Sequence, residues 1–330
     1  MKKAIIYYYT GTGNTRIAAT EIKRCLDGKG YATNLYEIRK PGRAVPDPND
    51  YDVVGFGYPI HAFNAPQLFH LTIKHLPNVD CGKPAFIFKT SGEPFWLNNA
   101  SSASIIRFLK WKGFSVLMDR HLLMPYNILF RYDDALAKQM FIHTRMMAAV
   151  IVHDILDNKT TKRTIYPWTW LVMRLLRIQW YGARINGPLF HARKDKCRQC
   201  GLCSKMCPSD NIVYINGYPK FSFDCSMCMG CVAYCPADAI RPGLINPLRV
   251  HGGYPFTRLL ADDSLASDFI NENTNGYFRS FRNYYRKTYA EIERVRSQER
   301  DMLISPEETA QSQFNPVEFG CDMPAFEESP

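Results

Sequence analysis

The stretch KAIIYYYTGTGNTRIAATEIKRCLDGKG (residues 3–30) joins an apolar, β-rich run to a helical pattern through a loop of Gly and Thr. The apolar residues of the expected helix fall near one face: Ile17, Ala18, Ile22 and Cys25. Gly28 and Gly30 end this helix. A strand that turns directly into a helix is typical of the start of a β-α-β unit.

The same alternation continues through the first half of the chain. Strand patterns recur at 31–38, 52–59, 83–90 and 114–125, and helix patterns at about 65–76, 101–113 and 133–157. Short connections between them predict a parallel, doubly wound α/β sheet. Ligands in such sheets bind beyond the carboxyl ends of the strands. The expected functional loops are therefore 10–15, 58–64 and 90–98.

The loop YYYTGTGNT (7–15) places backbone N–H groups at a helix N-terminus, where they bind anions. A Walker A motif requires Gly-Lys-Ser/Thr, which this loop lacks, and Arg16 stands where the dinucleotide motif has its third glycine. Threonine hydroxyls beside backbone donors suit a terminal monophosphate, as on FMN. The alternative is a glycine turn with a threonine cap and no ligand.

TGTGNT resembles the phosphate loop of flavodoxins, and GYPIHAFNAP (57–66) and TSGEPFW (90–96) resemble their second and third loops. The resemblance implies a flavodoxin-like sheet of order 2-1-3-4-5 that binds FMN. The implied phosphate-binding residues are Thr10, Gly11, Thr12, Gly13, Asn14 and Thr15. The implied ring-binding residues are Tyr58, Pro59, Ile60 and His61 on one side, and Thr90, Ser91, Gly92, Glu93 and Phe95 or Trp96 on the other. Trp96 is equally well explained as a core or interface residue, and His61 is expected to be a structural hydrogen-bonding residue rather than a proton donor.

Two cysteine runs, CRQCGLCSKMCP (197–208) and CSMCMGCVAYCP (225–236), repeat the spacing C-x2-C-x2-C-x3-C-P. This spacing resembles the ligand run of bacterial ferredoxins, in which the fourth cysteine binds the other [4Fe–4S] cluster. It implies one cluster on Cys197, Cys200, Cys203 and Cys235, and another on Cys225, Cys228, Cys231 and Cys207. Two structural zinc sites are the alternative, but zinc has no use for a third closely spaced cysteine or the trailing Cys-Pro.

Other features support an internal duplication and a cofactor role for these cysteines. PSDNI (208–212) and PADAI (236–240) follow the fourth cysteine of each run, and Asn216-Gly217 between the runs predicts a hairpin. The remaining cysteines, Cys25, Cys81 and Cys321, are expected to be ordinary thiols.

The formal net charge of +10 includes none of the cofactors. Each cluster with its thiolates adds about −2 and an FMN phosphate about −2, which leaves about +4. Nucleic-acid binding thereby loses its main support, and we expect an acidic protein redox partner instead. The N-terminus has no signal-peptide pattern, and the best apolar run (165–182) is interrupted by Arg174 and Arg177. These features predict a cytoplasmic protein without a transmembrane segment, with a membrane-surface helix in the connector as an alternative.

The whole pattern resembles the flavodoxin–ferredoxin fusion proteins. The expected organisation is a flavodoxin-like FMN-binding domain (1–157), a basic, aromatic, helical connector (158–190), a small α+β two-[4Fe–4S] ferredoxin module (191–245) and a C-terminal extension (246–330). A helix is expected at 277–300, and an acidic, irregular tail after 301.

This combination predicts an electron-transfer iron–sulfur flavoprotein that passes electrons between FMN, the clusters and a protein partner. Two alternatives remain. One is an FMN-dependent reductase of a quinone or nitro compound that receives its electrons through the clusters, and the other is a redox-sensing regulator. The sequence shows no substrate pocket and no catalytic acid.

Overall fold

The structure, a computed structural model, describes residues 1–40, 44–161 and 168–301. Its centre is a parallel sheet of order β2-β1-β3-β4-β5. The strands are β1 (Lys2–Tyr8), β2 (Tyr31–Glu37), β3 (Val53–Pro59), β4 (Lys83–Ser91) and β5 (Phe114–Leu123). The predicted doubly wound sheet and its strand order are therefore confirmed.

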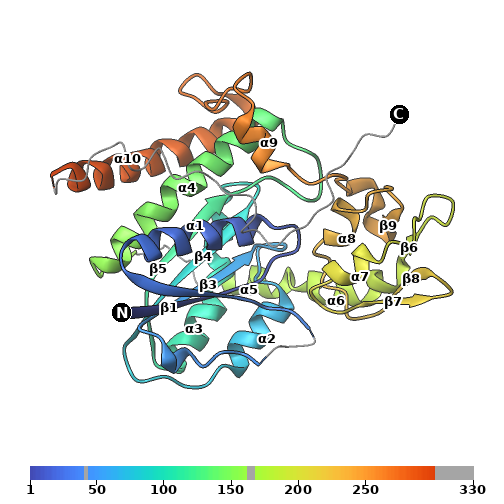
Figure 1. The fold of residues 1–330 in the computed structure, drawn as a ribbon, viewed down its shortest axis with the longest axis horizontal. Coiled ribbons are helices and arrows are strands. Elements are labelled where there is room, and N and C mark those ends of the chain that lie inside the picture. Colours follow the sequence, from blue (N-terminus) through green and yellow to red (C-terminus); the bar gives the residue numbers. More distant parts are fainter. Residues whose placement is uncertain (41–43, 162–167, 302–330) are drawn as a thin grey trace.

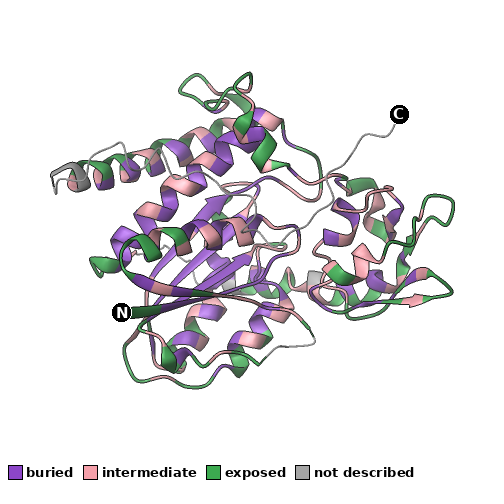
Figure 2. Cartoon of the chain, viewed as in Figure 1, coloured by how far each residue is buried: buried purple, intermediate pink, exposed green. Residues whose placement is uncertain are grey.

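Helices cover both faces of this sheet (Figure 1). One face carries α1 (Asn14–Gly28) and α4 (Asp134–Leu156), and the other carries α2 (Gln67–His75) and α3 (Ala103–Trp111). β1, β3 and β4 are largely buried between these layers (Figure 2), as their apolar sequences predict, whereas the edge strand β2 is mostly half-exposed. The helix predicted at 101–113 is shorter than expected, because 96–102 forms the 3-10 segment η2 (Trp96–Ser102).

The C-terminal extension adds a further layer outside α4 (Figure 1). It contains α9 (Phe256–Ala261), η5 (Gly276–Phe278) and α10 (Arg279–Asp301). Ile292 and Val295 of α10 join the core on the α1–α4 side, and Arg294 donates to the buried Asp154 of α4. This confirms the helix predicted at 277–300 to within two residues. The predicted acidic tail lies outside the described residues.

The connector contains α5 (Thr169–Leu175) and α6 (Ile178–Asn186), followed by η3 (Gly187–Leu189). Met173 and Ala183 are buried, and Trp180 donates its indole N–H to the carbonyl of Ala65. Two other apolar residues of the connector, Leu175 and Ile185, are both 68% exposed. Among the helices in the described ranges, none has the length and apolar character that a membrane span requires.

The cysteine module forms a separate small lobe beside the carboxyl edge of the sheet (Figure 1). Its elements are β6 (Phe190–Ala192), α7 (Leu202–Met206), β7 (Ile212–Ile215), β8 (Tyr218–Phe221), α8 (Gly230–Ala233), β9 (Ile240–Pro242) and η4 (Gly243–Leu248). β6 pairs with β9, and β7 with β8, both antiparallel. Asn216 and Gly217 both have positive φ, at 51° and 79°, so they form the predicted two-residue hairpin turn.

Candidate functional site

The three predicted loops meet at the carboxyl edge of the sheet. The hydroxyls of Thr15 and Thr90 share a 2.9 Å hydrogen bond, which joins the first loop to the third. The N–H of Ile60 donates to the carbonyl of Thr90, which joins the second loop to the third. The order of β1, β3 and β4 in the sheet thus brings together residues that lie 75 positions apart.

The first loop has the features of a phosphate cradle. Gly13 has φ +94° and lets the chain turn from β1 into α1, whose first-turn N–H groups have no acceptor inside the helix. The Thr10 hydroxyl accepts from the N–H of Gly13 at 3.0 Å, and the Asn14 amide is held by the carbonyl of Pro125. Backbone donors and threonine hydroxyls at a helix N-terminus are the groups that a terminal phosphate requires, so these residues fit the phosphate of FMN.

The second loop contains strained backbone of the kind that gathers at binding sites. Ala62 and Phe63 adopt positive φ, at 43° and 62°, inside a bridge between His61 and Asn64. Burial lowers the pKa of His61 to about 4, so its imidazole is neutral at pH 7. Tyr58 is wholly buried, and its hydroxyl shares a hydrogen bond with Ser101. This placement gives Tyr58 a packing role, while Pro59 and Ile60 are partly exposed.

The third loop is tied to its surroundings on both sides. The Ser91 hydroxyl donates to the carbonyl of Glu93 at 2.8 Å. A Cβ at Gly92 would lie 2.4 Å from the ring of Tyr126, so that position accepts only glycine without rearrangement. Tyr277 of the C-terminal extension contacts the Glu93 carboxylate. That contact was not predicted from the sequence.

The aromatic residues of the second and third loops lie together. The rings of Phe63 and Phe95 are 5.4 Å apart, and Trp96 contacts Trp168 of the connector at 5.3 Å. Phe95 and Trp96 are 40% and 45% exposed. Both candidates for stacking on a flavin ring are therefore accessible at the loop tips.

The first predicted set of thiols surrounds one cavity. Cys197, Cys200, Cys203 and Cys235 all line it, together with Arg198 and Tyr214. Cys235 comes from the second cysteine run, so this grouping has the crossed pattern that the spacing predicts. The Tyr214 hydroxyl lies 3.2 Å from the Cys203 sulfur, and Cys200 is exposed to solvent. Among the described residues, no three His, Cys, Asp or Glu side chains are placed to hold a single metal ion.

The second predicted set lies deeper. Burial raises the pKa of Cys225 to about 12 and that of Cys228 to about 11, and it also raises the pKa of Cys231 well above its usual value. All three thiols interact electrostatically with Cys207, the fourth predicted ligand. Thiolates at these positions therefore need a positive partner such as iron, which fits a cluster site.

The backbone of the module confirms the internal duplication. Non-glycine residues with positive φ recur at matching positions in the two runs: Gln199 and Met227, and Asp210 and Asp238. Four residues after the last cysteine of each run, a backbone N–H donates to its sulfur, at 3.3 Å to Cys207 and 3.1 Å to Cys235. Such bonds stabilise thiolate ligands and adjust the potential of a cluster.

The module lies directly on the phosphate loop, which the sequence did not predict. The Tyr9 hydroxyl shares a 2.6 Å hydrogen bond with Ser226, and the Tyr234 hydroxyl donates to the carbonyl of Thr12 at 2.5 Å. A Cβ at Gly11 would lie 2.5 Å from both Cβ and the carbonyl oxygen of Cys228. The only sequence signal for this contact was the presence of small and hydroxyl-bearing residues in the second cysteine run.

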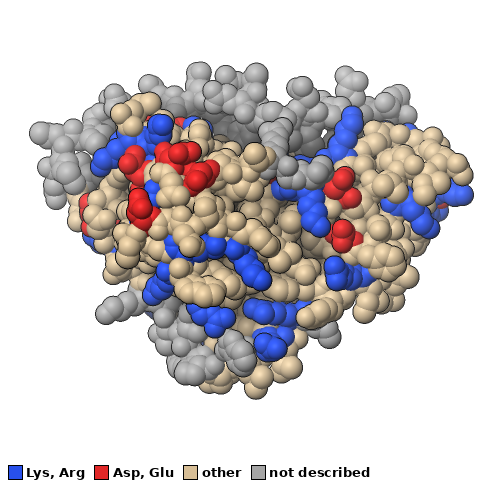
Figure 3. Space-filling model, turned by 90° about the horizontal axis from the view of Figure 1, so that it is seen from below, with Lys and Arg blue, Asp and Glu red and all other residues tan. Residues whose placement is uncertain are grey.

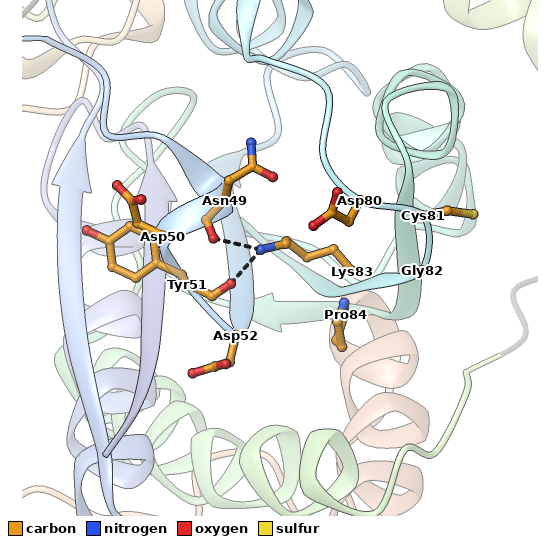
Figure 4. Close-up of a pocket in the computed structure, with 9 residues that line it drawn as sticks. All are labelled: Asn49, Asp50, Tyr51, Asp52, Asp80, Cys81, Gly82, Lys83 and Pro84. Carbon is orange, nitrogen blue, oxygen red and sulfur yellow. Dashed lines mark hydrogen bonds between the residues drawn. The ribbon is translucent and has the colours of Figure 1, made fainter.

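A polar pocket of about 360 Å³ lies at the other end of the strands (Figure 4). It is lined by residues 49–52 and 80–84. Its lysine, Lys83, donates to the backbone carbonyls of Pro48, Asn49 and Tyr51 at 2.8–3.2 Å. Lys83 therefore anchors the turn before β3, and this pocket lies away from the loops and cysteines described above.

Comparisons with known proteins agree with this organisation. Residues 191–244 match a family model described as a 4Fe-4S dicluster domain. The chain is 32% identical over 89 residues to pyruvate synthase subunit PorD of Thermotoga maritima, a match that covers 26% of this chain and 75% of that protein. Flavodoxin 2 of Bacillus cereus is 16% identical, with a TM-score of 0.35, and the match covers 47% of this chain and 98% of that one. An archaeal flavodoxin is 12% identical, with a TM-score of 0.31, covering 47% and 99%.

The fold itself rests on the parallel order 2-1-3-4-5 rather than on these structural scores. That sheet and a module with two ferredoxin-type cysteine runs together define an iron–sulfur flavoprotein. The chain thus combines a flavodoxin-like domain with a two-[4Fe–4S] dicluster module, which is the organisation of a flavodoxin–ferredoxin fusion. The cofactors of this organisation are FMN and two [4Fe–4S] clusters, and the loops and thiols described above fit them.

Proposed function

We propose that the chain passes electrons between FMN and two [4Fe–4S] clusters, and on to a protein redox partner. FMN exchanges electrons singly or in pairs, whereas each cluster exchanges one at a time, so the pair joins two-electron to one-electron chemistry. The observation that carries the proposal is the direct contact of the phosphate loop with the residues around Cys228. Two cofactor sites in van der Waals contact suit electron transfer within one chain.

The proposed ligands are Cys197, Cys200, Cys203 and Cys235 for one cluster, and Cys225, Cys228, Cys231 and Cys207 for the other. The shared cavity supports the first set, and the mutual electrostatic interactions of the thiols support the second. FMN is proposed to place its phosphate on residues 10–15 and its ring between the second and third loops. The accessible rings of Phe95 and Trp96 support that orientation.

The proposed partner is an acidic protein that docks at the outer cluster site. Arg198 lines that cavity beside the exposed Cys200, and Lys194, Lys196 and Lys205 are exposed nearby in the sequence. Figure 3 shows Lys and Arg spread over much of one face, whereas Asp and Glu gather mainly in one group. PorD is by name a subunit of a larger enzyme, which supports docking of such a module on a protein. A cytoplasmic location is part of the proposal, because cluster ligands must stay reduced before assembly.

The test is an anaerobic purification followed by visible spectra during reduction. We expect bands of both flavin and iron–sulfur clusters, and bleaching by dithionite or a reduced ferredoxin but not by NADH or NADPH. Bleaching by NADH or NADPH would instead support an FMN-dependent reductase. A spectrum without flavin bands, from protein given excess FMN, would contradict the assignment of the first loop.

A further inference from the structure

We propose that Tyr9 and Tyr234 join the phosphate loop and the cysteine module into one ligand-binding unit, so that cluster loading and FMN binding strengthen each other. The inference rests on the cofactors proposed above and adds a coupling between their sites. The two tyrosines are positioning residues, because they act through the neighbours that their hydroxyls hold.

The contact surface between the two parts is backbone against backbone. A Cβ at Gly11 would collide with the backbone of Cys228. A Cβ at Gly230 would lie 2.5 Å from the carbonyl oxygen of Gly11. Neither neighbour is the end of a flexible side chain. A shift of the Cys228 segment therefore moves the phosphate loop, or opens a gap beside it.

Tyr9 connects this contact to both segments that supply the deeper thiols. Its side chain is fully buried at the end of β1. Its hydroxyl bonds to Ser226, which lies between two predicted ligands and itself bonds to Ser209 at 2.9 Å. Ser209 follows Cys207 by two residues, so one partly buried chain of hydroxyls joins the end of β1 to both cysteine runs.

Tyr234 makes the second connection, on the other side of the loop. It directly precedes Cys235, a predicted ligand of the outer cluster, and its hydroxyl holds the carbonyl of Thr12. The same hydroxyl would lie 3.6 Å from a Cβ at Gly13. The loop conformation that presents N–H groups to a phosphate is thus fixed in part by a residue beside a cluster ligand.

Cluster loss should release these contacts, because the module has little else to hold its shape. Its buried apolar core is small: Phe190, Ile212, Phe221, Met229, Val232 and Ile240. Domains of this size usually depend on metals or disulfides. Without iron, residues 225–235 lose their ligand bonds, and FMN must then order the loop alone, so its affinity falls. By reciprocity, FMN must also favour the cluster-loaded form.

The test measures FMN binding to the full chain in two forms, one with clusters reconstituted and one stripped of iron by a chelator. FMN is titrated anaerobically, and quenching of its fluorescence gives Kd. We expect Kd to be about tenfold lower in the loaded form, within the usual range of such couplings. Iron content per chain verifies each form, and added FMN should slow the removal of iron by the chelator.

Two variants locate the coupling. The double variant Tyr9→Phe/Tyr234→Phe should reduce the loaded-to-stripped ratio of Kd to less than about threefold. Tyr7→Phe is the matched control, because Tyr7 is also buried on β1 but donates to the carbonyl of Pro46, away from the module. The control should keep the wild-type ratio.

Equal Kd values for the two wild-type forms would overturn the inference and leave the cofactor assignment intact. A loaded-to-stripped ratio of Kd in the double variant equal to the wild-type ratio would contradict the role of the two tyrosines. Failure of FMN to bind either form would overturn the proposed function and this inference together. If the double variant does not fold, the wild-type ratio and the iron-release measurement decide the question.

Discussion

Replacing Gly230 by alanine should loosen the cysteine module from the phosphate loop without changing the loop itself. The added Cβ would lie 2.5 Å from the carbonyl oxygen of Gly11 and 3.4 Å from its carbonyl carbon. Ordinary contacts between such atoms need 3.4–4 Å. The two backbones must therefore separate by about 1 Å, and neither can relieve the clash by rotating a side chain.

Overpacking of this kind costs about 1–3 kcal/mol. Because the clash occurs only when the module is docked, this energy weakens docking by about 5- to 150-fold. The assay uses the cluster-loaded chain without FMN, so that an effect of the substitution on binding of the FMN phosphate cannot change the result. We expect faster release of iron to a chelator and faster limited proteolysis between the domains, with the iron content at the start unchanged.

Gly28→Ala is the control, since a Cβ at Gly28, the last residue of α1, would meet no atom within 4 Å. That variant should release iron at the wild-type rate. Gly11→Ala should behave like Gly230→Ala, because its Cβ meets the Cys228 backbone at the same interface. Iron release and proteolysis in Gly230→Ala that match those of the control would refute the claim that close backbone contact holds the module in place.

Three further outcomes follow from buried or ligating groups. Lys89→Met should lower the free energy of unfolding by about 3–5 kcal/mol, because it leaves Asp119 buried without its 2.9 Å ion pair. Urea titrations measure this change, and stability equal to that of the wild type would contradict it. Burial lowers the pKa of His143 from 6.5 to about 3, so between these pH values the unfolded chain binds a proton at this histidine and the folded chain does not. The free energy of unfolding should therefore fall as pH drops from 6.5 toward 3, by up to about 1.4 kcal/mol per pH unit. His143→Gln should make that loss of stability less steep, while His61 and His70, whose pKa values burial also lowers to about 4, still contribute to it. An unchanged slope would contradict the assignment to His143. Cys235→Ser should remove about half of the iron, whereas Cys81→Ser should retain it all; equal iron in both would contradict the crossed ligand sets.

The sequence was sufficient to predict the sheet and the loops because both depend on local patterns. Buried parallel strands read as apolar runs, and a loop between strand and helix must lie at the carboxyl edge. The hairpin at Asn216-Gly217 was equally local, since both residues must adopt positive φ. Interactions within a few residues decide each of these features.

Contacts between distant residues could not be predicted in this way. The Tyr9–Ser226 and Tyr234–Thr12 bonds join residues separated by 217 and 222 positions. Gly11 was interpreted only as a glycine of the phosphate loop. That interpretation gave no reason to expect that close contact with Cys228 also requires a glycine at this position. The exposure of Leu175 and Ile185 in the connector could not be predicted either, because apolar composition alone does not determine which neighbour covers a helix.

The internal duplication nevertheless shows which residues fit the second cysteine run to the phosphate loop. The first run also contacts the flavodoxin-like domain, but elsewhere: Arg39 donates to the carbonyls of Lys205 and Cys207. The two cysteine runs correspond with an offset of 28 positions, from Cys197 to Cys225. Besides Cys228, the second-run residues at the phosphate loop and the adjoining Tyr9 include Ser226, Gly230 and Tyr234. Their counterparts in the first run are Arg198, Leu202 and Met206. A leucine in place of Gly230 would collide with the Gly11 carbonyl, and neither arginine nor methionine can replace the two hydroxyl bonds. Arginine instead suits a solvent-facing site for an acidic partner. The two runs share their cysteine spacing but differ in the side chains at these positions, and those of the second run are the ones that fit the phosphate loop.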